Sequence, residues 1–257
     1  MSNEPKVVMR AEGVSKHFGG IQALDSVDFE IREGEVMGLV GDNGAGKSTL
    51  TNVLTGIYPP DGGTLYLGEE EIRFHNRQHA KELGIEAVYQ ELGLVDSLDA
   101  GANMFLGSER TKRFLGMRIL DNKRMRSEAA ETLKHQLGIV LGNIKQPVFN
   151  LSGGQKQSVA IGRSIQQQST RILLLDEPTA ALGPEETQKI LDLVKHLAGQ
   201  NMPIVIIAHN LEHIFAVTDR ITVLRRGRMV GVRETKNSSR QDILGLIIGA
   251  DEEATSN

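Results

Sequence analysis

The sequence predicts an α/β fold with a mainly parallel sheet at its core, an antiparallel β subdomain and an inserted α-helical subdomain. Two stretches, 171–175 and 203–208, continue as unbroken apolar runs after their first residues, Arg171 and Pro203, and such runs are typical of parallel strands that are buried on both faces. A third stretch, at 35–40, is apolar after Glu35 and leads directly into a glycine-rich loop and a helix. Strand patterns fade after Gln90, and helical patterns replace them over the next stretch of the chain.

From these patterns we expect one domain over residues 7–249. Its α/β core and β subdomain comprise 7–90 and 166–249, and the helical subdomain comprises 91–165. The last residues, 250–257, are expected to form a disordered tail.

Composition limits the functions that the chain can have. The 257 residues suffice for a sizeable core, and the formal net charge is −4. Nucleic-acid binding is not expected, because it favours a strongly basic face or domain. Cysteine is absent, which excludes a disulfide framework and fits the cytoplasm. Residues 1–6 lack the apolar centre of a signal peptide, and no run approaches the roughly 18 apolar residues of a membrane span.

Residues 7–90 are expected to combine short strands with one strand–loop–helix unit. Residues 27–31 alternate apolar and acidic side chains, which is the pattern of a half-exposed strand. Turns are expected at 16–20, 33–34 and 58–63, where glycine and proline concentrate. Strands are expected at 7–11, 27–31, 35–40, 64–67 and 85–89, and a helix at 48–55.

The remaining elements follow from similar patterns. A basic stretch, Arg110-Thr111-Lys112-Arg113, is interpreted as a solvated loop between two helices of the helical subdomain. Pro184 favours a helix start, because proline suits the first helical turn. Helices are expected at 100–106, 122–137, 184–197 and 241–248, and strands at 171–175, 203–208, 221–224 and 229–232.

The glycine-rich loop matches the spacing of a phosphate-binding loop, Gly-x4-Gly-Lys-Ser/Thr. Its glycines allow backbone N–H groups to turn toward a polyphosphate without Cβ clashes. Lys47 can reach the β- and γ-phosphates, the Ser48 hydroxyl can bind Mg²⁺, and the following helix presents its positive end to the anion. An incidental glycine-rich turn is the alternative, but the strand–loop–helix setting favours a P-loop NTPase core. The nucleotide-binding residues are then Gly41, Asp42, Asn43, Gly44, Ala45, Gly46, Lys47, Ser48 and Thr49.

Two carboxylates, Asp176 and Glu177, follow the apolar strand at 171–175. Ligands of open α/β sheets bind at the carboxyl ends of the strands. Asp176 can hold Mg²⁺, often through water, and Glu177 can polarise an attacking water. An acidic turn is the structural alternative, and the upstream phosphate loop favours the catalytic interpretation.

Residues 151–155, Leu-Ser-Gly-Gly-Gln, predict the N-terminus of a helix. Ser152 can cap this helix, and Gln155 lies where a capping box requires it. A helix N-terminus beside glycines also binds anions, so capping and ligand binding are compatible. The spacing alone does not identify the anion.

Together these motifs resemble those of the ATP-binding cassette (ABC) ATPases, over roughly residues 7–249. Leu-Ser-Gly-Gly-Gln at 151–155 is similar to the family's signature. Gln90 matches the Q-loop glutamine, His209 the switch histidine, and Phe18 the aromatic residue that stacks on adenine. Outside this ordered set, Phe18 would be interpreted as a core residue and His209 as a cap after a strand.

The resemblance implies a head-to-tail dimer that binds two ATP molecules. Each ATP lies between the phosphate loop of one subunit and the signature of the other. The chain has one copy of each motif, so a homodimer or a pair with a similar chain is expected. The signature residues that would contact the partner's γ-phosphate are Ser152, Gly153, Gly154 and Gln155.

The resemblance also implies catalytic and metal roles, with ATP and Mg²⁺ as cofactors. Glu177 would act as general base, and His209 would contact the γ-phosphate and order the attacking water. Lys47 would bind the phosphates. Gln90 would link Mg²⁺ to the subdomain that meets the membrane subunits, and the Mg²⁺ ligands would be Ser48, Gln90 and Asp176.

One position departs from the family pattern. The family usually has an aspartate where this chain has Gly183, after Ala180-Ala181-Leu182. That aspartate helps to connect the two sites across the dimer, so the departure affects the coupling between sites and leaves the nucleotide ligands in place.

Several short stretches resemble bacterial monosaccharide importers of the ribose, xylose and fructose type: 88–92, 103–107 and 177–182. Many of those proteins carry two cassettes, whereas this chain has one cassette and is similar to the fructose-type form. The implied partners are integral membrane permease subunits and, indirectly, a periplasmic sugar-binding protein. The implied location is peripheral, on the cytoplasmic face of the bacterial inner membrane.

Two other functions stay open at this point. A soluble ABC ATPase acting in translation or DNA repair usually has two cassettes or a long coiled-coil insert, and neither is visible here. A non-hydrolysing scaffold cassette is the other, and the presence of Glu177 and His209 argues against it.

Overall fold

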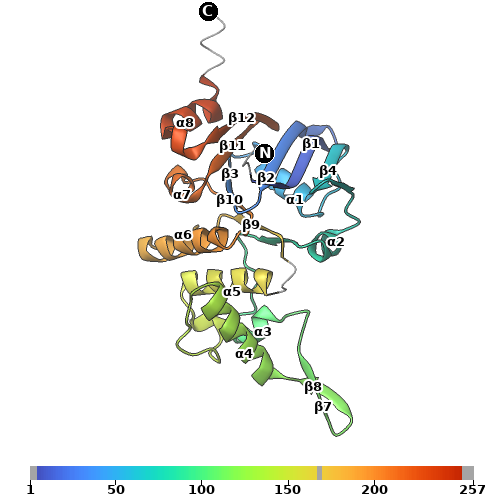
Figure 1. The fold of residues 1–257 in the computed structure, drawn as a ribbon, viewed down its shortest axis with the longest axis vertical. Coiled ribbons are helices and arrows are strands. Elements are labelled where there is room, and N and C mark those ends of the chain that lie inside the picture. The colour runs from blue at the N-terminus through green and yellow to red at the C-terminus, as the bar shows by residue number, and fades with distance from the viewer. Residues whose placement is uncertain (1–4, 167–169, 251–257) are drawn as a thin grey trace, which may run out of the picture.

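The computed structural model describes residues 5–166 and 170–250 (Figure 1). This part of the chain contains a six-stranded sheet, a four-stranded antiparallel sheet, a two-stranded hairpin and the helices around them. The predicted α/β fold class is confirmed. None of the helices in the described ranges is long and apolar enough to cross a membrane. The tail predicted at 250–257 lies outside the described residues except for Ala250.

The six-stranded sheet has the order β12-β11-β3-β10-β9-β6. All pairs among β11, β3, β10, β9 and β6 are parallel, and β12 pairs antiparallel with β11 at one edge. Every residue of β3, β6 and β10 is buried, and the apolar run at 203–208 predicted this for β10. The strands are β3 (Val36–Val40), β6 (Ile85–Val88), β9 (Ile172–Asp176), β10 (Ile204–Ile207), β11 (Arg220–Arg225) and β12 (Arg228–Glu234).

The antiparallel sheet has the order β2-β1-β4-β5. It comprises β1 (Val7–Phe18), β2 (Ile21–Arg32), β4 (Gly62–Leu67) and β5 (Glu70–Ile72). The turn predicted at 16–20 is wrong for its first three residues, because β1 continues to Phe18. The Lys16 ammonium and the His17 N–H both donate to the Asp61 carboxylate, at 2.8 and 2.7 Å, which holds this end of β1 against β4. Only Gly19 and Gly20 form the turn.

Five helices accompany the two sheets. They are α1 (Lys47–Leu54), α2 (Arg77–Glu82), α6 (Pro184–Gly199), α7 (Leu211–Val217) and α8 (Arg240–Ile248). The helices predicted at 48–55, 184–197 and 241–248 are confirmed within one or two residues at each end. The short helices α2 and α7 were not predicted, because six or seven residues are too few to show a clear helical period.

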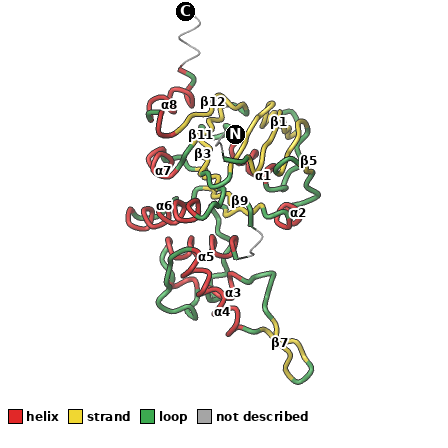
Figure 2. The backbone as a smooth tube through the Cα atoms, viewed as in Figure 1, coloured by secondary structure: helices red, strands yellow, loops and turns green. Residues whose placement is uncertain are grey.

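The remaining helices gather at one end of the molecule, on the far side of α6 from the sheets (Figure 2). They are α3 (Ala100–Met104), α4 (Asn122–Glu131) and α5 (Gly153–Ile165). The helix predicted at 122–137 is present, but its last part, Thr132–Gln136, is a π-helical turn. A 3₁₀ turn at Val148–Asn150 precedes α5, and another at Thr235–Asn237 precedes α8.

The basic stretch predicted as a loop is mostly strand. Residues Thr111–Phe114 form β7, which pairs antiparallel with β8 (Met117–Leu120). The two residues between them, Leu115 and Gly116, have φ values of +48° and +81°. Positive φ at both central positions is the geometry that joins two strands in a tight hairpin. The prediction failed because the turn begins with leucine, which rarely adopts such a conformation.

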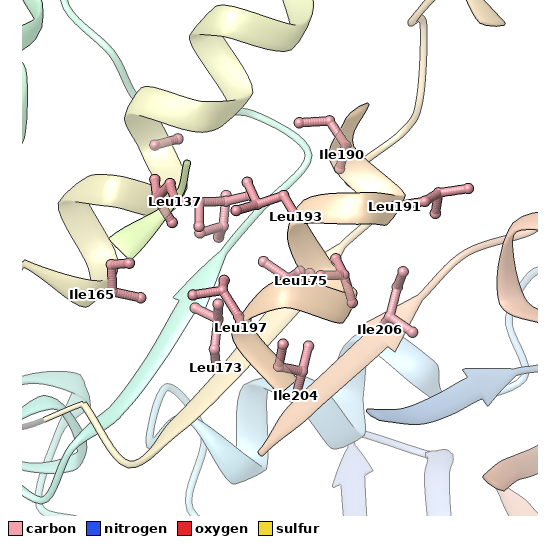
Figure 3. Packing of buried hydrophobic residues seen from close by; sticks show 14 of the residues in the cluster. Leu137, Ile165, Leu173, Leu175, Ile190, Leu191, Leu193, Leu197, Ile204 and Ile206 are labelled. Atoms are coloured by element: carbon pink, nitrogen blue, oxygen red, sulfur yellow. The ribbon is translucent and has the colours of Figure 1, made fainter. Parts of the chain in front are cut away.

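The hydrophobic core lies on both faces of the six-stranded sheet. Alternate residues of β9 point to opposite faces, so Leu173 and Leu175 belong to one cluster, and Ile172 and Leu174 to the other. Figure 3 shows the first cluster, in which Leu193 and Leu197 of α6 lie beside the strand residues. Further labelled members are Leu137, Ile165, Ile190, Leu191, Ile204 and Ile206. This cluster reaches the helices of the far end, so one continuous core joins them to the sheet.

Candidate nucleotide-binding site

The phosphate loop connects β3 to α1 at the carboxyl edge of the parallel sheet. Its Lys47 side chain is buried, and the ammonium donates to the carbonyl oxygens of Gly41 and Asp42 at 2.8 and 3.0 Å. Helix α1 begins after Gly46 without a side-chain cap or an acidic residue in its first turn. Its first N–H groups and its positive dipole end are therefore suited to an anionic ligand.

Two glycines of the loop are required by the backbone. Gly41 has φ +155°, and a Cβ atom there would lie 2.2 Å from the carbonyl oxygen of Leu224. Gly46 has φ +107°, and its Cβ would lie 2.8 Å from the carbonyl oxygen of Ala23. Neither backbone carbonyl can move aside cheaply, so side chains are excluded at both positions. Gly44 has φ +76° and open space around it.

The two carboxylates lie where β9 ends. Asp176 is its last residue and pairs with Ile207 of the neighbouring strand β10. Glu177 has φ +51°, and its N–H donates to the Ile207 carbonyl oxygen at 2.8 Å. This left-handed conformation is uncommon outside glycine and marks a constrained position.

His209 follows β10 and faces Glu177. Its Nε2 atom lies 3.4 Å from Oε1 of the carboxylate. That oxygen is buried and accepts no hydrogen bond from the described residues, so the contact has ion-pair distance without hydrogen-bond geometry. The Glu177 side chain is 16% exposed and that of His209 is 54% exposed. A buried, unsatisfied carboxylate oxygen beside an accessible histidine is suited to receive a proton from a ligand or a water.

Burial controls the charges of this site. It raises the pKa of Glu177, and the neighbouring Asp176 raises it further, while His209 opposes the shift. Burial also raises the pKa of Asp176, against the effect of Lys47. Burial lowers the pKa of Lys47. The negative charges of nearby carboxylates, with that of Glu177 the largest, oppose this shift. The three groups therefore interact electrostatically although they come from two distant parts of the chain.

Phe18 ends β1 and is 41% exposed. Its ring meets Tyr58 edge-on, with 5.1 Å between the ring centres, and the Lys16 ammonium lies 5.7 Å from the Phe18 ring centre. The Tyr58 N–H donates to the Asn52 carbonyl oxygen of α1, which holds the aromatic pair beside the phosphate-loop helix. An accessible ring at this place is suited to stack on a planar base.

The sequence Leu-Ser-Gly-Gly-Gln begins α5, and the predicted capping box is present. The Ser152 hydroxyl accepts from the Gln155 N–H, and the Gln155 side chain accepts from the Ser152 N–H at 3.0 Å. Gly153 and Gly154 lie against α6 and the turn before it, because Cβ atoms there would meet Leu182 and Glu186. Within the described chain, no hydrogen bond or ion pair links residues 152–155 with the phosphate loop.

Comparisons with known proteins agree with this arrangement. A family model described as "ABC transporter" matches residues 24–180. The chain is also 40% identical to the fructose import ATP-binding protein FrcA of Rhizobium meliloti, over 98% of this chain and 97% of that protein.

This chain belongs to the ABC transporter family.

Other relatives and solved cassettes extend the comparison. The galactofuranose transporter ATP-binding protein YtfR of Escherichia coli K12 is 40% identical over 96% of this chain. The chain spans only about half of that protein, 48% of its length. A solved ATP-binding cassette in its ADP conformation is 26% identical, with a TM-score of 0.80 and coverage of 95% and 99% of the two chains. A dimeric cassette bound to ADP and Pi is 26% identical with a TM-score of 0.73, covering 90% of this chain and 100% of that one.

The cassette fold brings four predicted residues to one edge of the sheet: Lys47, Asp176, Glu177 and His209. Gln90 is exposed after β6, the strand next to β9. Phe18 lies on the antiparallel sheet and the signature lies at the N-terminus of α5. The predicted set is therefore distributed over one compact site and three outlying positions.

Glu186 is a residue that the motif analysis missed. It lies in the first turn of α6. Hydrogen bonds from the Ser152 hydroxyl and the Gly154 N–H lower the pKa of its carboxyl group. A carboxylate thus occupies the same donors that the ABC family resemblance assigns to a phosphate. Its place after Pro184 is a sequence signal for a helix start, but nothing local indicates which loop it meets.

Proposed function

We propose that this chain is the ATP-hydrolysing subunit of a bacterial ABC importer for a monosaccharide. The observation that carries the proposal is the convergence of Lys47, Asp176, Glu177 and His209 at the ends of adjacent strands. It combines a phosphate-binding cation, a metal-binding carboxylate, a partly buried base and a histidine beside that base. Phosphoryl transfer depends mainly on such positioning and charge stabilisation.

The groups that would bind ATP already lie in suitable positions in the structure. The N–H groups of the loop 41–49 and the N-terminus of α1 would bind the phosphates. Lys47 would exchange the two loop carbonyls that it now contacts for phosphate oxygens. The exposed ring of Phe18 would stack on the adenine.

Mg²⁺ would be held by the Ser48 hydroxyl, Asp176 and Gln90, together with phosphate oxygens. The described residues contain no cluster of three or more His, Cys, Asp and Glu side chains that could hold a metal ion without such help. These residues therefore suit a Mg²⁺ ion that arrives bound to the nucleotide, which is how Mg²⁺ commonly binds at such sites. The ion supplies positive charge that neutralises the phosphates.

Glu177 would accept the proton of the attacking water. Its left-handed backbone and the hydrogen bond to Ile207 hold the carboxylate in place, and burial favours proton uptake. His209, 3.4 Å away, would contact the γ-phosphate and keep the water aligned.

The complete site would require a second copy of the chain. Ser152, Gly153, Gly154 and Gln155 would contact ATP held by the phosphate loop of the partner in a head-to-tail homodimer. The likeness to a dimeric cassette bound to ADP and Pi supports this arrangement. In each chain the core would comprise 7–90 and 166–249, and the helical subdomain 91–165.

The transport role is inferred from relatives. Several are named import ATP-binding proteins for fructose or ribose, and another is a galactofuranose transporter ATP-binding protein. The partners would be membrane permease subunits and, indirectly, a periplasmic sugar-binding protein, at the cytoplasmic face of the bacterial membrane. Fructose is our proposed sugar, since the fructose relative matches this chain over nearly the full length of both proteins.

The decisive test of the chemistry is Glu177→Gln, compared with Glu70→Gln, an exposed glutamate of the edge strand β5. We expect Glu177→Gln to bind ATP normally and to hydrolyse it at least about 100-fold more slowly, the usual scale of general-base catalysis. The control should hydrolyse ATP at the wild-type rate. Near-wild-type hydrolysis by Glu177→Gln would show that this residue is not the base.

The transport role has its own test. Tagged Glu177→Gln protein would be isolated with ATP and Mg²⁺ from membranes in mild detergent, and its partners identified by mass spectrometry. A multi-span permease is the expected partner. Ribosomal or DNA-bound partners without a permease would instead favour the soluble ABC ATPase, with the ATP chemistry unchanged.

A further inference from the structure

The β7–β8 hairpin projects from the helical end of the molecule (Figures 1 and 2). All ten residues of 111–120 are exposed. Several are large and apolar: Phe114 is 57% exposed, Leu115 83% and Met117 62%. Such a concentration of exposed apolar side chains is unusual on a protein surface. A two-stranded hairpin without further packing is also at best marginally stable in water.

The strand register sorts these side chains onto two faces. Phe114 pairs with Met117, and Lys112 pairs with Ile119. Side chains alternate along a strand and directly paired residues share a face, so these four lie together. This face, which we call the apolar face, carries three apolar side chains and one lysine. The opposite face carries Thr111, Arg113, Arg118 and Leu120, and Leu115 lies at the tip.

The hairpin also lies in the most basic part of the sequence. Residues 110–126 contain seven basic residues and one acidic residue in a chain of net charge −4. Several of the basic residues outside the strands are neutralised, for example Arg124 by Glu128 at 2.6 Å and Arg126 by Asp99 at 2.6 Å. Among the residues that the structure describes, the Thr111 hydroxyl is the one group to which Arg118 of the hairpin donates. Across the described residues, no carboxylate lies within ion-pair distance of Arg113 or Arg118.

We propose that the β7–β8 hairpin binds the surface of a membrane that contains anionic lipids. The apolar face and Leu115 insert among the acyl chains near the headgroups, and Arg113 and Arg118 contact lipid phosphates. Amphiphilic segments with aromatic and aliphatic side chains on one side and basic residues on the other bind membrane interfaces in this way. Lys112, whose ammonium lies 3.8 Å from the Asp121 carboxylate, exchanges this contact for the headgroups by extending its alkyl chain from the apolar face.

Charge complementarity favours an anionic lipid surface over an apolar protein groove as the binding partner of the hairpin. A protein groove would cover the apolar face but would leave the arginines of the other face without a counter-charge. An anionic lipid surface satisfies both faces at once. The contact does not depend on a permease, so the inference goes beyond the proposed transport function and can fail or succeed separately from it.

A fluorescence experiment tests insertion directly. The chain contains no tryptophan, so Phe114→Trp introduces a unique reporter. We expect its emission to shift to the blue and to resist iodide quenching with vesicles that contain phosphatidylglycerol, and not with pure phosphatidylcholine vesicles. The control is Ile248→Trp on α8, which is similarly exposed at 74% and should show no shift. No blue shift at position 114, or an equal shift in both variants, would overturn the proposal.

Vesicle flotation tests the charges. The double variant Arg113→Glu/Arg118→Glu should lose at least tenfold in partition onto anionic vesicles, as should Phe114→Ser/Met117→Ser. The matched control Arg73→Glu/Lys236→Glu changes the net charge equally at exposed sites outside the hairpin and should bind as the wild type does. All four changed hairpin residues are exposed, so ATP hydrolysis in solution should report intact folding.

Two outcomes would contradict the inference. Wild-type protein that partitions onto no vesicle, while the hairpin variants lose a permease in detergent, would assign the hairpin to protein docking. Equal binding of the hairpin variants and the wild type would remove the hairpin from membrane contact altogether. High salt should weaken the wild-type interaction, since the arginine contribution is electrostatic.

Discussion

Glu177 combines a left-handed backbone with a partly buried carboxylate whose pKa is raised. The hydrogen bond from its N–H to Ile207 holds this conformation at the junction of β9 and the following turn. Strain of this kind persists only where the surrounding structure enforces it, and it concentrates at functional sites. The residue is thus prepared for proton uptake before any ligand binds.

The raised pKa predicts the pH dependence of ATP hydrolysis. The base must be ionised to accept a proton, so activity should fall as the pH decreases through the pKa of Glu177. Because burial raises that pKa, the loss should occur above the ordinary range of a glutamate. A pH–rate profile at saturating ATP measures this.

The control for the pH profile is the residual hydrolysis of Glu177→Gln. It should lack the loss of activity on the acidic side. If the variant keeps the same pH dependence, the titrating group is a different one, and Asp176 is the first candidate because its pKa is also raised.

The phosphate loop gives a second prediction at the residue scale. In Gly41→Ala the new Cβ would collide with the Leu224 carbonyl, in addition to a backbone strain of about 1–3 kcal/mol. Gly44→Ala has positive φ and open space, so it should lose only roughly 1–2 kcal/mol. Urea unfolding should rank Gly41→Ala as less stable, with weaker ATP binding. Equal stability of the two variants would contradict the expected clash with the Leu224 carbonyl oxygen.

At the scale of single elements, α5 and α8 form a natural comparison. Both begin with a capping box, at Ser152 with Gln155 and at Ser239 with Asp242. Replacing either serine by alanine should lower the free energy of unfolding by about 1 kcal/mol, the usual value of an N-cap. Denaturant unfolding of the two variants measures this.

The two caps should differ in function. Ser152→Ala should also slow ATP hydrolysis, because we propose that this hydroxyl contacts the partner's nucleotide. Ser239→Ala should leave hydrolysis unchanged. Equal rates of hydrolysis in both variants would show that Ser152 caps α5 and does not contact the nucleotide.

The carboxylate of Glu186 adds to this picture of α5. It accepts hydrogen bonds from Ser152 and Gly154, which are donors that we assign to the γ-phosphate of the partner's ATP. In the proposed dimer these donors would have to exchange a carboxylate for a phosphate. The connection between α5 and the start of α6 is therefore part of the proposed dimer interface.

At the scale of the whole molecule, the proposed dimer predicts nucleotide-dependent assembly. With ATP, Glu177→Gln should elute as a dimer, because the bound nucleotide is not consumed. Adding Lys47→Ala should keep it monomeric, since phosphate binding is lost. Light scattering coupled to size-exclusion chromatography measures the mass. A Glu177→Gln protein that stays monomeric at high ATP would contradict the composite site.

Local spacing within the sequence determined several features of this protein. The phosphate loop, the Asp176–Glu177 pair, the buried parallel strands and the capping box of α5 are encoded by consecutive residues. Their chemistry or periodicity has one good structural solution, so each was predictable. Membership of the ABC transporter family follows from the order of such motifs.

Only the tertiary structure decided how these motifs meet. The pairing of β9 with β10 places His209 beside Glu177, and the packing of α6 places Glu186 against the signature. The left-handed turn at Leu115 makes a hairpin from a stretch that resembled a loop. Strand order, register and helix packing depend on contacts between distant residues, whose free energies are summed over the whole core. No short stretch of sequence contains that information.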